Sequence, residues 1–231
     1  MWREKQKNQK LNLFNKKMDS FNIAVFASGN GSNLQSLLNT KKLNNEDSID
    51  VSVVFSNKLD AYALKRAEKS NIPFFSINPA SFDDRKKFDV AVLNKLKTFN
   101  FDLIVLAGYM RILSKEFLRE FEGKIINLHP SLLPKYPGLN THQKVIENKD
   151  SHHGATVHFV DEGLDTGQII GFSKFKIKEY EINLLEAKVH KIEHKLLPLI
   201  CSLIKNKRLE FKNNELKIDN IEYPDGKEFY F

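Results

Sequence analysis

The amino-acid sequence predicts a single α/β domain built on a doubly wound, mostly parallel sheet with helices on both faces. Apolar runs rich in Val, Ile and Phe alternate with amphipathic stretches from Phe21 onward, and this repeating strand–helix order is typical of such sheets. The length of 231 residues, with 41% hydrophobic and 28% charged residues, is ordinary for one globular domain. No internal repeat or low-complexity linker divides the chain, so one domain is the simplest organisation.

Each expected element follows from the periodicity of its apolar residues. The expected strands are residues 22–27, 49–55, 72–77, 101–107, 124–128, 154–160 and 167–177. The expected helices are residues 32–38, 60–70, 83–99, 115–121 and 181–205. Residues 101–107 form the most continuously apolar strand, whereas Phe88, Val92 and Leu96 recur at the helical period. Residues 209–223 fit either a strand pair or an irregular tail.

Charge divides the chain into a basic extension and a nearly neutral body. Residues 1–17 contain six Lys or Arg against Glu4 alone, so they carry +5 of the net charge of +7. We expect residues 1–20 to be a disordered extension, residues 21–223 the folded domain and residues 224–231 a C-terminal tail. For the extension, a transit peptide and an upstream start preceding Met18 are alternatives, although it has one Arg and no Ser or Thr before Ser20.

The composition argues against several classes of protein. The body carries only the remaining +2, which argues against a nucleic-acid partner. No run approaches the roughly 18 consecutive apolar residues of a membrane span. The single cysteine, Cys201, cannot form an internal disulfide and fits a reducing compartment. We therefore expect a cytoplasmic monomer or homodimer whose partners are small molecules, with no nucleic acid and no membrane.

Ligands of such a sheet bind outside the carboxyl ends of its parallel strands, where three loops are candidates. The first loop, residues 28–33 (Ser-Gly-Asn-Gly-Ser-Asn), opens the first helix, and its small residues let backbone N–H groups approach a phosphate. Leu34 stands where a dinucleotide fingerprint has its third glycine, so a monophosphate suits this loop better than NAD. The alternative is a tight turn capped by Ser32.

The second and third loops have apolar and proline-rich sequences. Residues 107–113 (Ala-Gly-Tyr-Met-Arg-Ile-Leu) follow the most buried strand, and Met110, Ile112 and Leu113 offer an apolar wall to a flat heteroaromatic ligand. Core packing is the alternative for these three side chains. The third loop, residues 127–138, contains three prolines that stiffen its backbone.

The third loop and a downstream acidic segment supply groups suited to acyl transfer to an amine. Asn127 can donate a hydrogen bond to a developing oxyanion, His129 can hold or move a proton, and Asp165 can orient that histidine. The alternative is an Asn-x-His-Pro turn with a solvated acidic loop downstream. No metal is expected, because the acidic residue beside His190 and His194 is not placed as in a zinc-binding His-Glu-x-x-His helix.

Four segments together resemble the phosphoribosylglycinamide formyltransferases, folate-dependent members of the formyltransferase superfamily with a Rossmann-like fold. These segments are residues 23–34, 107–114, 126–138 and 153–160, and the resemblance spans about residues 21–223 in unbroken order. The His-Pro-Ser-Leu-Leu-Pro core at residues 129–134 is shared across the superfamily. Ser-Gly-Asn-Gly-Ser-Asn together with Lys-Tyr-Pro-Gly at residues 135–138 is typical of this member.

The resemblance implies a set of site residues. The implied catalytic residues are Asn127, His129 and Asp165. The implied ribonucleotide-binding residues are Gly31, Ser32, Asn33 and Glu193. The implied folate-binding residues are Met110, Arg111, Ile112, Leu113, Asp161, Glu162, Gly163 and Leu164. The pair Thr166-Gly167 departs slightly from the small pair common in the family, and we interpret His158 as a strand residue with a packing role.

The resemblance also implies a reaction, in which glycinamide ribonucleotide attacks the formyl carbon of 10-formyltetrahydrofolate in purine synthesis. Asn127 and a protonated His129 would stabilise the oxyanion while Asp165 assists proton transfer, with neither an acyl-enzyme nor a metal. The alternatives include methionyl-tRNA formyltransferase and formyltetrahydrofolate hydrolase, whose extra C-terminal or N-terminal domains find little room in this sequence. A non-enzymatic nucleotide-binding module would keep the 28–33 loop but lose the catalytic trio.

Overall fold

The computed structural model describes residues 21–42, 48–212 and 215–231, and the predicted extension of residues 1–20 lies outside them. The strands are β1 (Asn22–Phe26), β2 (Asp50–Ser56), β3 (Phe74–Ser76), β4 (Leu103–Leu106), β5 (Ile125–His129), β6 (His152–Phe159), β7 (Ile169–Lys176), β8 (Leu209–Lys212), β9 (Glu215–Ile218), β10 (Ile221–Glu222) and β11 (Lys227–Glu228). The helices are α2 (Ser32–Asn39), α3 (Tyr62–Lys69), α4 (Arg85–Leu96), α5 (Lys115–Glu120), α6 (Thr141–Glu147) and α7 (Ile182–Lys205), with short 3₁₀ turns η1 (Thr40–Lys42) and η2 (Pro79–Ser81). Among the described helices, none is long and apolar enough to cross a membrane.

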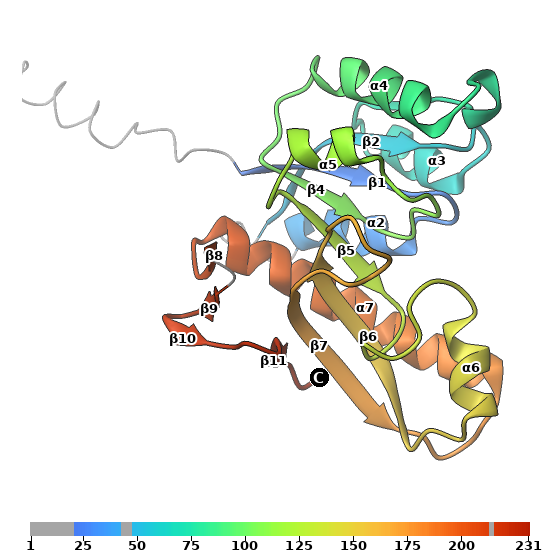
Figure 1. Ribbon diagram of the computed structural model, residues 1–231, viewed down its shortest axis with the longest axis vertical. Helices are drawn as coiled ribbons and strands as arrows, with labels where there is room; N and C mark the ends of the chain where they lie inside the picture. The colour runs from blue at the N-terminus through green and yellow to red at the C-terminus, as the bar shows by residue number, and fades with distance from the viewer. Residues whose placement is uncertain (1–20, 43–47, 213–214) are drawn as a thin grey trace, which may run out of the picture.

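The large sheet has the strand order β11-β7-β6-β5-β4-β1-β2-β3 (Figure 1). The strands from β3 to β5 are parallel, whereas β6 pairs with β5 and with β7 in antiparallel fashion. The order reverses at β1, because β2 and β4 lie on opposite sides of it, and such a reversal opens a crevice at the carboxyl ends of the strands. The predicted mostly parallel, doubly wound α/β fold is confirmed.

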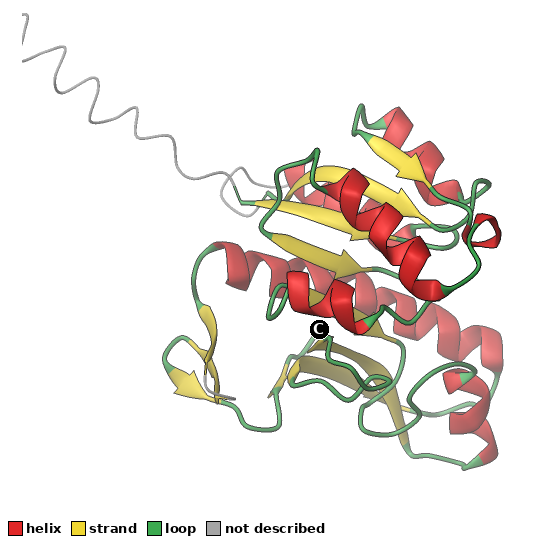
Figure 2. Cartoon of the chain, turned by 45° about the horizontal axis from the view of Figure 1, so that its top comes forward, coloured by secondary structure: helices red, strands yellow, loops and turns green. Residues whose placement is uncertain are grey.

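Alternating side chains divide the core between the two faces of the sheet. In β1, Ile23 and Val25 pack with α2, α3 and α7, whereas Ala24 and Phe26 pack with α4 and α5 on the other face. Figure 2 shows helices on both sides of the sheet. Both faces are buried, which explains why the parallel strands are continuously apolar rather than alternating. Phe26 and Phe55 meet edge to face with ring centroids 4.9 Å apart, a geometry that adds about 0.5–1.5 kcal/mol beyond burial.

The C-terminal part of the chain and one short helix differ from expectation. Helix α6 is not predicted, because its start depends on a backbone conformation that apolar periodicity does not reveal. It follows Asn140, whose φ of 60° is left-handed. Strands β8, β9 and β10 form a separate antiparallel sheet in the order β10-β9-β8, beside the end of α7. The segment 224–231 contains β11, which pairs in parallel with β7.

Candidate active site

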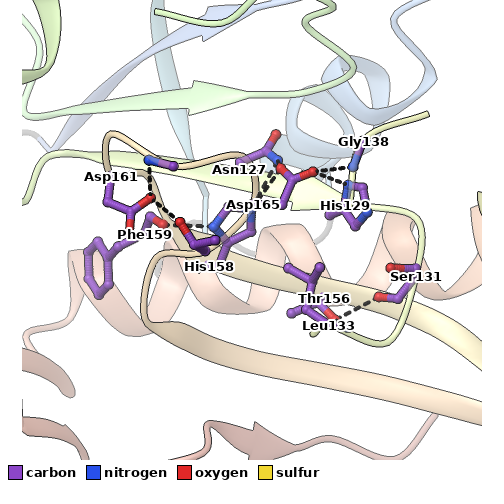
Figure 3. A network of polar contacts seen from close by, with 12 residues as sticks. Asn127, His129, Ser131, Leu133, Gly138, Thr156, His158, Phe159, Asp161 and Asp165 are labelled. Atoms are coloured by element: carbon purple, nitrogen blue, oxygen red, sulfur yellow. Dashed lines mark hydrogen bonds and ion pairs between the residues drawn. The ribbon is translucent and has the colours of Figure 1, made fainter. Parts of the chain in front are cut away.

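The register of the sheet places Asn127 and His129 on one face. Ile126 and Leu128 of β5 pack into the core on the α7 side, so the residues that alternate with them point to the opposite face. The antiparallel pairing of β5 with β6 sets Asn127 directly opposite His158. Figure 3 shows these three side chains gathered around the carboxylate of Asp165.

Asp165 reaches this cluster from the loop between β6 and β7, where its φ of 55° is uncommon for a non-glycine residue. Its Oδ2 accepts the Gly138 N–H at 2.8 Å and lies 3.4 Å from His129 Nδ1. Its Oδ1 accepts from Asn127 Nδ2 at 3.2 Å. Burial alone would raise the pKa of Asp165, but the neighbouring His158, the hydrogen bond from the Gly138 N–H and the nearby His129 lower it below its usual value. Asp165 is therefore a carboxylate at neutral pH.

His129 is 4% exposed, and each of its ring nitrogens faces an acceptor. Nε2 lies 2.8 Å from the carbonyl oxygen of Tyr136, which can only accept, so Nε2 carries a hydrogen and Nδ1 faces Asp165. Burial lowers the pKa of His129 below 6.5, against the opposing effects of the Tyr136 carbonyl and the Asp165 carboxylate. The direction favours a neutral ring near pH 7 before reaction, and the expected protonated His129 belongs to the intermediate.

The interpretation of His158 as a packing residue is wrong, because its ring belongs to the polar cluster. Its Nδ1 donates to its neighbour's carbonyl, the Phe159 oxygen, at 2.7 Å, which leaves Nε2 free to accept. Nε2 lies 3.0 Å from Asn127 Nδ2 and 3.5 Å from Asp165 Oδ1. The amide of Asn127 therefore directs its N–H groups to His158 and Asp165. The place of His158 in this cluster follows from the pairing of β5 with β6, which a single sequence does not reveal.

A pocket of about 430 Å³ adjoins the cluster and is walled by apolar side chains. Its exposed apolar residues are Met110 (62%), Ile112 (54%), Leu139 (66%) and Leu164 (49%). Leu113 also lines it while packing in the core, so both readings of that residue hold. Exposed apolar side chains gathered in a concave site are typical of a ligand pocket.

Polar residues at the rim of this pocket have distinct partners. The guanidinium of Arg111 lies 4.8 Å from the centre of the Phe88 ring. Asp161 Oδ1 accepts from the Gly163 N–H at 3.0 Å and from the Thr166 hydroxyl at 2.8 Å, so Asp161 organises the loop as well as lining the pocket. Glu162 does not line the pocket, because its carboxylate pairs with Lys115 at 2.5 Å.

A second pocket, of about 340 Å³, lies at the 28–33 loop. Gly31 is the N-cap of α2 with a φ of 73°, and a Cβ there would stand 2.7 Å from the Cβ of Ala63, so only glycine fits. Ser32 is the first helical residue and makes no cap hydrogen bond, contrary to the capped-turn alternative. The pocket also receives Lys58, from the carboxyl end of β2, and His190 of α7, neither of which was predicted.

Glu193 joins the second pocket from α7 and is 4% exposed. Its Oε2 accepts from Asn33 Nδ2 at 3.1 Å, and the Nε2 of His190 lies 4.0 Å away. Burial raises the pKa of the Glu193 carboxyl, against the opposing effects of Asn33 and His190. The structure thus brings Glu193 next to the consecutive residues Gly31, Ser32 and Asn33, from 160 positions away in the sequence.

The two pockets are contiguous. Gly108, Met110, Leu128 and Pro130 line both of them, and His129 lies between the last two. Two small molecules bound side by side would therefore meet next to a carboxylate, an imidazole and an amide. In the part of the chain that the structure describes, there is no cluster of three or more His, Cys, Asp or Glu that could hold a metal ion.

Comparison with known proteins identifies relatives of the whole described domain. A family described as Formyl transferase matches residues 21–201. Phosphoribosylglycinamide formyltransferase of Escherichia coli (strain K12) is 40% identical over 88% of this chain and 96% of that protein. The protein of the same name from Haemophilus influenzae is 42% identical over 89% of this chain and 94% of its own length.

Solved structures agree with these relatives. The phosphoribosylglycinamide formyltransferase of Coxiella burnetii superposes with a TM-score of 0.86 at 36% identity, covering 92% of this chain and all of that one. The chain therefore belongs to the phosphoribosylglycinamide formyltransferase family of formyl transferases and is an enzyme of the transferase class.

Proposed function

We propose that this enzyme transfers the formyl group of 10-formyltetrahydrofolate to the amine of glycinamide ribonucleotide, giving formylglycinamide ribonucleotide and tetrahydrofolate in purine synthesis. The observation that carries this proposal is the contiguity of the two pockets beside Asn127, His129 and Asp165. Transfer between two bound molecules requires adjoining sites, and the reacting atoms must meet at about 3–3.5 Å.

The chemistry of each pocket matches one substrate. The 340 Å³ pocket opens at the N-terminus of α2, where small residues and backbone N–H groups favour a phosphate, and Lys58 adds a positive charge. Glu193 offers a carboxylate to the glycinamide amine. The 430 Å³ pocket offers Met110, Ile112 and Leu164 to the flat pterin ring and Arg111 to its anionic tail.

Bond formation creates a negative oxygen that Asn127 and His129 stabilise, while Asp165 supports His129. The amine nitrogen attacks the formyl carbon, and the carbonyl oxygen of the formyl group becomes an oxyanion in the tetrahedral intermediate. Asn127 donates one of its N–H groups to this oxyanion, sharing the bond that it makes to Asp165 at 3.2 Å. The C–N bond to the folate then breaks as the oxyanion collapses to a carbonyl.

Proton transfer passes through His129. The ring is neutral before reaction, and Nδ1 is its accepting atom. The oxyanion adds a second negative charge beside Asp165, so the ring accepts the proton that the attacking nitrogen loses. The imidazolium donates its new Nδ1–H to the oxyanion, while its Nε2–H stays on the Tyr136 carbonyl and Asp165 stabilises the charged ring. The Nδ1 proton then passes to the departing folate nitrogen.

An absorbance assay for the folate product tests the reaction directly. Purified full-length enzyme is mixed with 10-formyltetrahydrofolate, with and without glycinamide ribonucleotide. We expect tetrahydrofolate to form only when the ribonucleotide is present. Equal rates without it would indicate a hydrolase, and equal formylation of charged initiator tRNA would indicate a tRNA formyltransferase; either result would overturn the proposal.

A further inference from the structure

Ser28 ties together the loops that line the two pockets. Its hydroxyl donates to Asn57 Oδ1 at 2.5 Å and accepts from the Met110 N–H at 2.8 Å. Its own N–H donates to the carbonyl oxygen of Gly108 at 3.0 Å. Ser28 is 3% exposed and Asn57 is 8% exposed, so water competes little for these hydrogen bonds. One buried side chain thus joins the segments that follow β1, β2 and β4.

The segments that Ser28 joins line the pockets proposed for the two substrates. Ser28 begins the 28–33 loop, and Asn57 immediately precedes Lys58, so both lead into the 340 Å³ pocket proposed for the ribonucleotide. Met110 lines this pocket and also the 430 Å³ pocket proposed for the folate. The hydroxyl proton of Ser28 is already given to Asn57, so this side chain has no proton to offer a substrate. Its hydroxyl instead bonds two residues of the loops around the site, Asn57 and Met110.

We propose that Ser28 is a positioning residue that fixes the 28–33 loop relative to the 107–113 loop, so that the amine and the formyl carbon meet at reactive distance. The inference rests on the function proposed above. Without the hydroxyl, each loop can still bind its own substrate, but the spacing between the two is no longer imposed. A displacement of about 1 Å between bound reactants can cost about 10²-fold in rate.

Ser28→Ala removes the link while leaving every catalytic group in place. We expect kcat to fall about 10–100-fold. The KM of each substrate, and its Kd measured with the other absent, should change less than about threefold. The pH profile of kcat should keep its shape, because His129 and Asp165 keep their surroundings. The matched control is Ser52→Ala in β2, whose buried hydroxyl has no hydrogen-bond partner among the described residues.

Asn57→Ala breaks the same link from its other end and carries the test if Ser28→Ala fails to fold. It should also lower kcat with little change in KM, and the double variant should be no slower than Ser28→Ala, because both remove one interaction.

The inference is overturned if the kcat of the folded Ser28 and Asn57 variants stays within about twofold of that of Ser52→Ala. It is overturned as well if a raised KM for one substrate accounts for the whole loss of activity. Failure of the proposed function looks different: the wild-type enzyme itself would then form no tetrahydrofolate in response to glycinamide ribonucleotide.

Discussion

Asn127, His129 and Asp165 act on a charge that exists only during the reaction, so each is expected to matter for turnover and little for stability. Asn127→Ala, His129→Ala or Asp165→Ala should lower kcat about 10²–10³-fold, the usual consequence of losing one group that stabilises an oxyanion. Steady-state kinetics on the three purified variants, alongside thermal melting, measures both effects.

His152→Ala is the matched control for these variants, since His152 is an exposed histidine at the start of β6. It should keep wild-type kinetics. Double substitutions within the trio should cost less than the product of the single effects, because the three groups serve one intermediate. Near-normal turnover in all three single variants would contradict the mechanism.

At the level of residues, the sequence predicted which side chains have suitable functional groups, but it did not predict which distant residues contact one another. Asn127 and His129 could be predicted because an amide and an imidazole stand two residues apart at the end of β5, just before a proline-rich loop. His158 could not, because its role depends on lying opposite Asn127 across an antiparallel pair. Lys58 did leave a signal, since it lies two residues beyond the carboxyl end of β2.

The 28–33 loop and helix α2 form the element that would receive the phosphate. A phosphate bound there contributes affinity without taking part in bond formation, so its loss should raise KM more than it lowers kcat. A dephosphorylated acceptor should therefore show a raised acceptor KM, a smaller change in kcat and unchanged folate affinity. Asn33→Leu should act likewise, with an added effect through the lost hydrogen bond to Glu193.

Ser36→Ala in the same helix is the control, because its hydroxyl bonds only the Asn33 carbonyl and lies outside the pocket. If Asn33→Leu weakened folate binding alone, the assignment of this loop to the ribonucleotide would be contradicted.

A buried histidine of β6, His153, contacts the half-buried His142 of α6. His142 Nδ1 lies 2.8 Å from His153 Nε2, so one hydrogen is shared between these two nitrogens and a hydrogen on both is excluded. Burial, together with the neighbouring His142, lowers the pKa of His153 to about 4, and burial also lowers that of His142. In the unfolded chain both would titrate near 6.5.

The unfolded state therefore takes up protons first as the pH falls. The stability that the neutral pair supports is fully present above pH 6.5 and is lost progressively toward pH 4, by about 1–3 kcal/mol from His153. Urea unfolding between pH 7.5 and 4.5 should show this slope, and His153→Phe should flatten it. His152→Phe, at an exposed neighbour, should not; equal slopes in both variants would refute the assignment.

At the level of elements, those of the parallel half were predicted, including the six-residue α5, whereas α6 and β11 were not. The predicted helices and the strands of the parallel half lie within a few residues of the observed ones, because burial on both faces imposes a strong pattern. Helix α6 was not predicted, because its start depends on the left-handed backbone of Asn140.

For the molecule as a whole, β1 obtains its partners from within the described residues. It pairs with β2 and β4, and the Asn22 N–H donates to Asp102 at 2.8 Å. The family match also starts at residue 21. Removing residues 1–17 should therefore leave kcat/KM within about twofold and Tm within about 3 °C of the intact chain. A large loss in either measurement would assign the segment a structural role.

The fold class was predictable at this scale because the order of strands and helices restricts the topology. The antiparallel half was harder to predict, since the pairing of β6 and β7 beside β5 requires a change of direction that periodicity does not encode.

Strand β11 protects the edge of the large sheet from pairing with a second molecule. It covers the outer edge of β7, where Gly171 lies so close that a Cβ on it would approach the Phe229 ring to 2.5 Å. A chain ending at residue 223 would leave the backbone N–H and C=O groups of that edge open to pairing with another copy. We expect such a chain to remain catalytically competent yet to self-associate, which light scattering at increasing concentration would reveal; a monodisperse truncated chain would contradict this protective role.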